Sequence, residues 1–202
     1  MLSSPPRMLP RFLPPRVSAV PHAAFADTVD WLTAAQLQPA PTEAVLDWLF
    51  DDGSLTRRLI ALSDDAFSVT PLQESWQTLR PDECAALHVR EGSVGWVREV
   101  FLRGHGQPWV FARSVAARSQ LLDSDLHMDE LGSRSLGELL FSDQAFSRGQ
   151  MQVCRYPQHW LPASVSAEQL WARRSLFSRD GLGVLVAEVF LPELWSAAAP
   201  RT

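Results

Sequence analysis

The sequence contains no lysine, so that all eighteen of its basic residues are arginine. This absence excludes Schiff-base chemistry and any mechanism that needs a lysine as its base. The sequence also has no run of arginines that would form the basic surface required by nucleic acid phosphates, and its net charge is -5. It therefore predicts neither a lysine-dependent enzyme nor a nucleic-acid-binding protein.

Cysteine is almost as scarce, since only Cys84 and Cys154 are present. They form no CxxC pair and no metal-binding cluster with the scattered histidines, which predicts reduced thiols in a cytoplasmic protein and no metal site. The sequence also lacks the Gly-x-Gly-x-x-Gly, P-loop, Gly-x-Ser-x-Gly and His-Glu-x-x-His motifs. A nucleotide cofactor, a serine hydrolase and a zinc peptidase therefore have no support.

The 202 residues are 46% hydrophobic and 20% charged, which predicts one folded core without disorder or membrane insertion. Eight of the fifteen prolines stand within residues 1–41, where they block regular helices and central strands. We therefore expect residues 1–41 to be a poorly ordered N-terminal extension and residues 42–202 to form a single domain. Trp31 and Leu32 are the residues of the extension that are candidates for packing on this domain.

The pattern of the domain predicts an α+β fold, because its helices do not alternate with its strands. Helices are expected first, at 43–50 after Thr42 and at 55–62 after Ser54, with short helical segments later at 119–126 and 135–141. About six mostly antiparallel strands are expected from segments 66–73, 95–115 (a hairpin of two strands), 148–156, 170–178 and 182–191. Asp180-Gly181 predicts a tight turn between the last two strands.

The central hairpin carries two arginines on its apolar side. With a loop at 104–107, Arg98 lies directly across from Arg113, and such a pair of like charges is unfavourable without an anion between them. One interpretation is that internal carboxylates such as Glu188 neutralise both arginines. The other interpretation is an anion-binding pocket on a rigid sheet. The sequence pattern leaves both open.

The last strand contains a second isolated charge, Glu188. Both faces of this strand are apolar, so Glu188 has no evident route to water and needs an arginine partner or a raised pKa. Arg98 is the expected partner. The same alternation predicts that Arg174 points inward and that Arg173 points outward.

The motifs follow one another as in a known family. The segments that resemble the successive motifs of chorismate pyruvate-lyase are Ser54-Leu-Thr-Arg-Arg58, Trp96-Val-Arg-Glu99 with Gln107-Pro-Trp109 and Ala112-Arg113, Leu136-Gly-Glu-Leu-Leu-Phe141, Leu170-Trp-Ala-Arg-Arg-Ser175 and Ala187-Glu-Val-Phe-Leu-Pro192. The order and spacing of the motifs, more than any single one, carry this resemblance. Leu55 replaces the usual Met of the family, and Ser135 replaces the usual Pro, but neither change removes a functional group.

The resemblance implies an antiparallel sheet with flanking helices, a buried site beneath helical flaps, and no metal or cofactor. It implies the conversion of chorismate to 4-hydroxybenzoate and pyruvate, the first committed step of ubiquinone biosynthesis, by a monomer that retains its product. Glu188 and Arg98 would be the catalytic residues, and Arg98, Arg113, Leu55, Leu136 and Glu188 would contact the substrate.

Two other functions are consistent with the same pattern. The first is a non-catalytic domain that senses a small aromatic acid, since the ligand-sensing domains of some transcription regulators are similar in fold to this lyase. No helix-turn-helix pattern precedes residue 42, which argues against a regulator. The second is a structural protein whose inward charges pair among themselves.

Overall fold

A computed structural model describes residues 29–122, 124–143, 145–165 and 167–199 of the chain. Most of the helices are short and stand at the ends of the sheet or between its strands. In chain order the elements are η1 (Ala34–Gln36), α1 (Glu43–Leu49), α2 (Leu55–Leu62), β1 (Phe67–Thr78), α3 (Pro81–Ala86), β2 (Val94–Gly104), β3 (Gln107–Ala117), α4 (Arg118–Leu121), η2 (Met128–Glu130), α5 (Leu136–Ser142), β4 (Ser147–Arg148), β5 (Gln152–Tyr156), η3 (Gln158–Trp160), β6 (Leu170–Arg179), β7 (Leu182–Phe190) and α6 (Pro192–Ala198).

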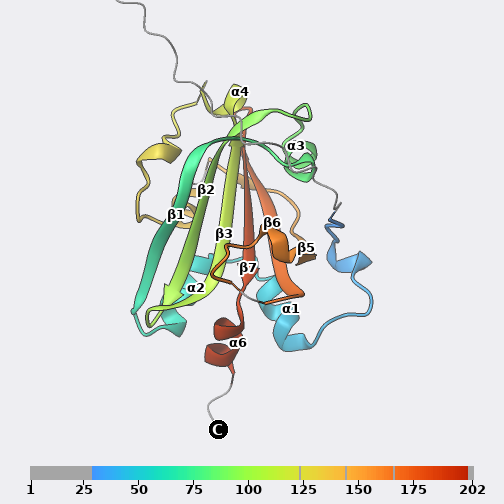
Figure 1. Ribbon diagram of the computed structural model, residues 1–202, viewed down its shortest axis with the longest axis vertical. Coiled ribbons are helices and arrows are strands. Elements are labelled where there is room, and N and C mark those ends of the chain that lie inside the picture. Colours follow the sequence, from blue (N-terminus) through green and yellow to red (C-terminus); the bar gives the residue numbers. More distant parts are fainter. Residues whose placement is uncertain (1–28, 123, 144, 166, 200–202) are drawn as a thin grey trace, which may run out of the picture.

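The strands form one antiparallel sheet in the order β1-β2-β3-β7-β6-β4, with β5 also paired to β6 (Figure 1). This arrangement confirms the predicted α+β class. The described residues form seven strands, whereas six were expected, because segment 148–156 divides into β4 and β5. The sequence prediction missed α3 and α6, each of which begins with a proline at the first helical position.

Two tight turns connect the long central strands. Asp180 and Gly181 both have positive φ angles, 49° and 85°, in the β6–β7 turn that the sequence predicted. His105 and Gly106 make the same kind of turn between β2 and β3, with φ angles of 51° and 75°. Positive φ at both central residues matches the twist of the flanking strands, so these turns fix which strands are neighbours.

The register of the central hairpin differs from the prediction. Gly104 pairs with Gln107, but the pairing shifts by one residue at Trp109, so Arg98 lies across from Ser114 and not from Arg113. Trp109 is the extra residue, and its ring occupies the space over Gly104, where a Cβ atom would come within 2.2 Å of it. A one-residue bulge moves every later side chain of a strand to the opposite face. Arg98 and Arg113 therefore lie on opposite faces of the sheet.

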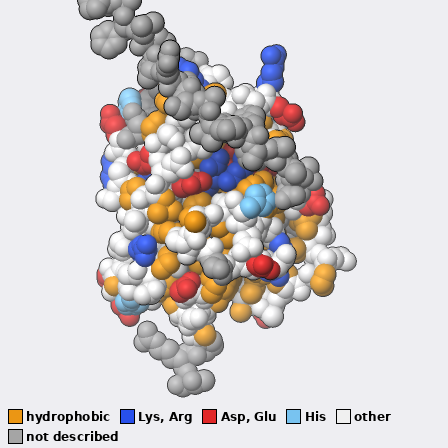
Figure 2. All heavy atoms as spheres, viewed as in Figure 1, with side chains coloured by type: hydrophobic (Ala, Val, Ile, Leu, Met, Phe, Trp, Pro, Cys, Tyr) orange, Lys and Arg blue, Asp and Glu red, His pale blue; other side chains and the backbone are white. Residues whose placement is uncertain are grey.

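Both faces of the sheet are covered, and each carries two hydrophobic clusters. On the face that bears Glu188, one cluster contains residues of α1, α2 and α6, and the other contains residues of α4 and α5. On the face that bears Arg113, one cluster gathers around Trp160 and the other around α3. We call these the Glu188 face and the Arg113 face. In Figure 1, α1 and α2 lie behind the sheet. Figure 2 has the same viewpoint and therefore shows the side away from α1 and α2, with basic and acidic side chains grouped above a hydrophobic area.

The segment before residue 42 also packs on the domain from residue 29 onward. The Trp31 Nε1 donates a 3.0 Å hydrogen bond to Asp82, and the Arg174 guanidinium lies 4.4 Å from the centre of the Trp31 ring. Leu32 forms a β-bridge with Val153. The boundary expected at residue 41 therefore does not separate packed from unpacked chain, because Trp31 and Leu32 belong to the folded part. Residues 1–28 lie outside the described part.

Among the described residues, none of the helices is both long enough and apolar enough to span a bilayer. Cys84 and Cys154 are both buried as free thiols.

Candidate functional site

Glu188 lies near the middle of β7, between the two hydrophobic clusters of its face. Its Oε2 accepts a 2.7 Å hydrogen bond from Nε of Arg173, which stands directly across from it on β6. Two backbone carbonyls hold the same guanidinium, since Nη1 of Arg173 donates to Trp48 O at 2.9 Å and to Asp51 O at 3.0 Å. Arg173 is 1% exposed, so the prediction that it points outward is wrong. Alternation along β6 could not identify an outward face because both faces are covered.

Arg98 lies on the same face, on β2. Its Nε donates to Glu74 Oε1 at 2.6 Å, while its Nη2 donates to the backbone carbonyls of Gly132 at 2.5 Å and Arg134 at 3.0 Å. The predicted pairing of Arg98 with Glu188 is therefore wrong in this structure. The residue is 2% exposed, and its contacts fix the loop that leads into α5. Carboxylates do neutralise the inward arginines, as one interpretation of the sequence held, but Glu188 is the partner of neither Arg98 nor Arg113.

Small side chains lie between Arg98 and Glu188 on this face of the sheet, and we call them the floor. Ser114 pairs with Arg98 on one side and with Val186 on the other, and Ala112 pairs with Glu188. Because β3 separates β2 from β7 and neighbouring strands lie about 4.8 Å apart, the strands that carry Arg98 and Glu188 are about 10 Å apart, and Glu188 lies two residues along β7 from the row of Arg98. This separation suits a six-membered ring that carries polar groups at opposite ends.

The first residues of two helices meet above this floor. Leu55 begins α2 and Leu136 begins α5, and the hydroxyls of their neighbours Thr56 and Ser135 lie 2.7 Å apart. Leu55 and Leu136 are each 3% exposed. The first N–H groups of a helix have no partner within the helix, and they carry a partial positive charge. Both helix starts therefore bring anion-binding groups to the Glu188 face.

A buried donor without a partner lies beside Arg98. The indole Nε1 of Trp96, two residues before Arg98 on the same face of β2, has no hydrogen-bond partner among the described residues. A buried polar atom without a partner is costly, and such atoms often mark the place of a missing ligand or water. The donor adds to the positive character of the Arg98 end of the site.

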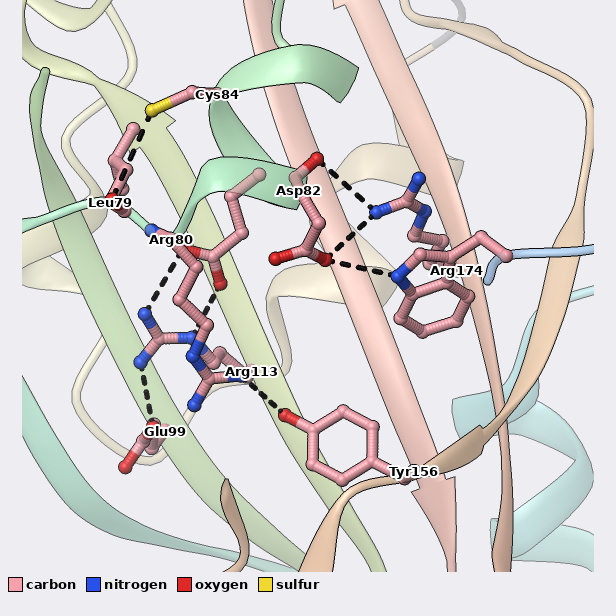
Figure 3. Close-up of polar contacts among 10 residues, drawn as sticks. Leu79, Arg80, Asp82, Cys84, Glu99, Arg113, Tyr156 and Arg174 are labelled. Atoms are coloured by element: carbon pink, nitrogen blue, oxygen red, sulfur yellow. Dashed lines mark hydrogen bonds and ion pairs between the residues drawn. The ribbon is translucent and has the colours of Figure 1, made fainter. Parts of the chain in front are cut away.

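The Arg113 face shows a different arrangement, which Figure 3 draws. Arg113 donates from Nε and Nη2 to the two carboxylate oxygens of Glu83, at 2.6 and 3.1 Å, and from Nη1 to Glu99 at 2.8 Å. Burial alone would raise the pKa of Glu83, but the charges and hydrogen bonds of Arg113 and Arg80 outweigh burial and lower it. Burial would lower the pKa of Arg113, yet Glu83 and Glu99 raise it. Each charge thus holds the other ionised.

The rest of this network is also internal. Arg80 donates to the Tyr156 hydroxyl at 2.8 Å, and Arg174 donates to Asp82 at 3.1 Å (Figure 3). Burial raises the pKa of Tyr156. The cavity within the network measures about 10 Å³, enough for one water molecule. Arg174 points inward as predicted, and the network it joins encloses only this small cavity. Outside the network, Arg174 and Asp82 also line an open groove of about 510 Å³.

Of the five residues expected to form the site, the structure brings four to the Glu188 face: Arg98, Glu188, Leu55 and Leu136. The fifth, Arg113, lies on the opposite face of the sheet, where its guanidinium pairs with two carboxylates. Sequence reasoning missed Arg173 and Glu74 as the partners of Glu188 and Arg98. Two consecutive arginines in a strand that is apolar on both faces were the available signal for Arg173, because both had to be buried.

The chain is similar to known proteins over most of its length. A family model described as chorismate lyase matches residues 25–199. A probable chorismate pyruvate-lyase 2 from Pseudomonas fluorescens (strain Pf0-1) is 67% identical over 171 residues, which are 85% of this chain and 93% of that protein. A probable chorismate pyruvate-lyase from Pseudomonas aeruginosa (strain UCBPP-PA14) is 68% identical over 169 residues, or 83% of this chain and 94% of that protein.

Among solved structures, the C-terminal domain of PhnF resembles this fold with a TM-score of 0.51 at 16% sequence identity. The match covers 62% of this chain and 83% of that domain. At this level of identity the likeness concerns the fold alone.

Proposed function

The chain belongs to the chorismate lyase family, and on this premise we propose that it converts chorismate to 4-hydroxybenzoate and pyruvate at the Glu188 face of its sheet. The observation that carries the proposal is the placement of Arg98 and Glu188 at opposite ends of a floor of small side chains. Chorismate carries a ring carboxylate and, across the ring from it, a hydroxyl group. A cation at one end and a hydrogen-bond acceptor at the other fit these two groups.

The ring carboxylate belongs at the Arg98 end. There it would meet the guanidinium and the first N–H groups of α2 and α5, at Leu55 and Leu136, so that three groups on different elements fix one anion. Arg98 is itself held by Glu74 and by two backbone carbonyls. A carboxylate bound there would have a fixed orientation, and the ring attached to it would be held in the position that the reaction needs.

Glu188 would face the ring oxygen. Arg173 binds one of its carboxylate oxygens, Oε2, and we propose that the other, Oε1, faces the ring oxygen. In the reaction, the bond between the ring and the enolpyruvyl oxygen breaks, and the proton leaves the ring carbon that bears the hydroxyl. The departing enol takes up a proton and becomes pyruvate. Glu188 either transfers the proton or holds the hydroxyl in place, and these two roles predict different kinetics.

The aromatic product supplies much of the driving force, so the protein has mainly to orient the substrate. We propose that 4-hydroxybenzoate is retained, because it keeps the carboxylate and the oxygen that Arg98 and Glu188 recognise. We propose further that the chain acts as a cytoplasmic monomer and that its product enters ubiquinone biosynthesis. The two buried free thiols support a reducing compartment. The molar mass of the purified protein, measured by light scattering, tests whether it is a monomer.

The resemblance also assigns Arg113 a ligand contact. Since its guanidinium lies on the opposite face, we propose that Arg113 acts on the site through β3, where it stands between the two floor residues Ala112 and Ser114. Its pairing with Glu83 and Glu99 would keep this strand, and with it the floor, in place.

The experiment compares the wild type with Arg98→Ala and with Arg103→Ala as a matched control. Arg103 lies on the same strand but bonds Thr70 and Gly106, away from the floor. Incubation with chorismate should produce an aromatic absorbance in the wild type and in the control. In Arg98→Ala, kcat/KM should fall on the order of a hundredfold, the loss expected for a charged hydrogen-bonding contact.

Thermal melting of all three proteins separates loss of the site from loss of the fold. Full turnover in a folded Arg98→Ala protein would contradict the site. A wild type that binds 4-hydroxybenzoate without turning chorismate over would instead indicate a sensing domain.

A further inference from the structure

The substrate of the proposed reaction has a second carboxylate, on its enolpyruvyl group, which the groups described so far do not bind. Arg98 serves the ring carboxylate. Arg173 pairs directly with Glu188, the group that would face the ring oxygen, and so balances that charge. A second cation near Glu188 with access to open space is therefore needed, and it should lie beyond β7, on the side away from Arg98.

Arg148, at the end of β4, stands at this place. Its Nε donates to the Ser175 hydroxyl at 2.9 Å, and its Nη1 donates to Asp52 O at 3.0 Å. Ser175 lies on the Glu188 face, across from Val186 and therefore in the same row as Ser114 and Arg98. Asp52 follows Asp51, whose carbonyl accepts from Arg173. Arg148 and Arg173 thus hold neighbouring carbonyls of one loop beside the site.

The charges around Arg148 agree with this position. Burial lowers the pKa of Arg148, and the nearby charge of Arg173 lowers it further, whereas the charges of Glu188, Asp51 and Asp52 oppose this shift. Glu188 is therefore close enough to act on Arg148 electrostatically.

Arg148 also borders a groove of about 450 Å³, which it shares with Asp52. Apolar side chains form much of its wall, namely Phe50, Leu140, Phe146, Met151 and Phe177. Two acids complete the lining. The side chain of Asp143 pairs with Arg179 at 2.6 Å, and Asp52 is exposed. An apolar wall with an arginine at its edge suits a group that combines a methylene with a carboxylate.

From this geometry we propose that Arg148 binds the carboxylate of the enolpyruvyl group and so distinguishes chorismate from its product. The inference rests on the proposed function and names a residue for which that function has no assigned role. The ring carboxylate would lie at Arg98 on β2, the ring over β3, the ring oxygen at Glu188 on β7, and the enolpyruvyl carboxylate at Arg148 beyond β6. The ligand would thus cross the sheet from one arginine to the other.

The consequence is a difference between substrate and product. Loss of Arg148 should weaken the binding of chorismate, which has both carboxylates, and should leave the binding of 4-hydroxybenzoate, which has one, unchanged. Loss of Arg98 should weaken the binding of both. A merely structural role of Arg148, through Ser175 or Asp52, would affect both ligands to the same extent.

The test uses Arg148→Gln and Arg148→Lys in the full chain, with KM for chorismate from initial rates and Kd for 4-hydroxybenzoate from titration. Arg148→Gln should raise KM about tenfold or more, the usual loss for one charged contact, while Kd stays within about twofold. Arg148→Lys, which keeps the charge, should recover part of the loss. Inhibition by added pyruvate should weaken in Arg148→Gln as well, since pyruvate carries the same carboxylate.

An unchanged KM in a folded Arg148→Gln protein, or equal changes in KM and in Kd, would overturn the proposal. If Arg148→Gln does not fold, the folded Arg148→Lys protein decides by the same comparison of KM with Kd. A wild type that fails to convert chorismate would refute the proposed function itself, which is a different result from a converting wild type whose KM is insensitive to Arg148.

Discussion

The two faces of the sheet carry similar residues across their middle but use them differently. On the Arg113 face, α3 contributes Glu83 and Asp82, and these carboxylates pair with Arg113 and Arg174 around an enclosed cavity of about 10 Å³, so that the open groove of about 510 Å³ on this face lies outside the ion pairs. On the Glu188 face, α2 and α5 bring their first backbone N–H groups over a floor of small side chains, and a groove of about 450 Å³ opens beside Arg148.

The comparison teaches that a buried arginine alone does not identify a binding site. Arg98 and Arg113 are both nearly inaccessible, 2% and 5% exposed, and each pairs with a glutamate. The difference lies in what covers them. Glu83 of α3 neutralises Arg113 with a bidentate ion pair. The loop before α5 instead gives Arg98 two uncharged backbone carbonyls, and this loop leads into the N-terminus of α5. The first arrangement stabilises the fold, and the second can accept an anion.

The largest expected effect on stability comes from breaking the Arg113 face. Arg113→Met leaves the buried charge of Glu83 with Arg80 alone and removes the guanidinium that pairs with the half-buried Glu99, which should lower the free energy of unfolding by about 3 kcal/mol. Urea unfolding monitored by tryptophan fluorescence measures this loss. The double variant Arg113→Met/Glu83→Leu should regain part of it, because no unpaired charge remains at Glu83. Turnover per folded molecule should fall much less in Arg113→Met than in Arg98→Ala. A stable Arg113→Met protein with the kinetic defect of Arg98→Ala would place Arg113 in the ligand site after all.

A smaller effect, which depends on pH, is expected at Glu83. Arg113 and Arg80 hold the pKa of Glu83 below the ordinary value of 4.5 in the folded chain. As the pH falls, Glu83 therefore takes up a proton at a higher pH in the unfolded chain than in the folded chain. The stabilisation is therefore fully present above pH 4.5 and is lost as the pH falls through the lower, folded pKa. Glu83→Gln should be less stable at pH 7 by about 1–3 kcal/mol, the value of hydrogen bonds to a charged group. Urea midpoints between pH 7 and pH 3 should converge for the two proteins toward the acid end. Parallel curves would mean that Glu83 does not carry the acid sensitivity.

The sequence was sufficient for most of the elements, but not for α3 and α6, and not for the register of the central hairpin. The pattern at 182–191, the Asp180-Gly181 turn and the Ser54 cap predicted β7, its hairpin and α2 correctly. The alternation of apolar and polar residues gave no sign of the bulge at Trp109, yet this bulge places Arg113 on the face opposite to Arg98. Its cause is three-dimensional, because the Trp109 ring covers Gly104.

The ion pairs of the site were beyond sequence reasoning for a similar reason. Glu188 was recognised as a charge that needs an arginine, but the choice between Arg98 and Arg173 depends on which strand lies beside β7. Glu74 and Glu83 pair with arginines 24 and 30 residues away, across an adjacent strand and from a helix that the sequence did not predict. Charge and alternation identify which residues are buried. The topology decides which of them meet.

The central claim is that Glu188 acts on the ring oxygen of a substrate bound on its own face of the sheet. Glu188→Gln tests it most directly, because the amide keeps the shape of the side chain and a hydrogen-bonding carbonyl but loses the negative charge and the ability to transfer a proton. The measurement is the single-turnover rate with chorismate and the dissociation constant of 4-hydroxybenzoate, for the wild type and for Glu188→Gln. We expect the rate to fall on the order of a hundredfold or more and the product affinity to change much less. Equal losses in both would show that Glu188 only binds, and a variant unchanged in both would contradict the account by reducing Glu188 to a structural partner of Arg173.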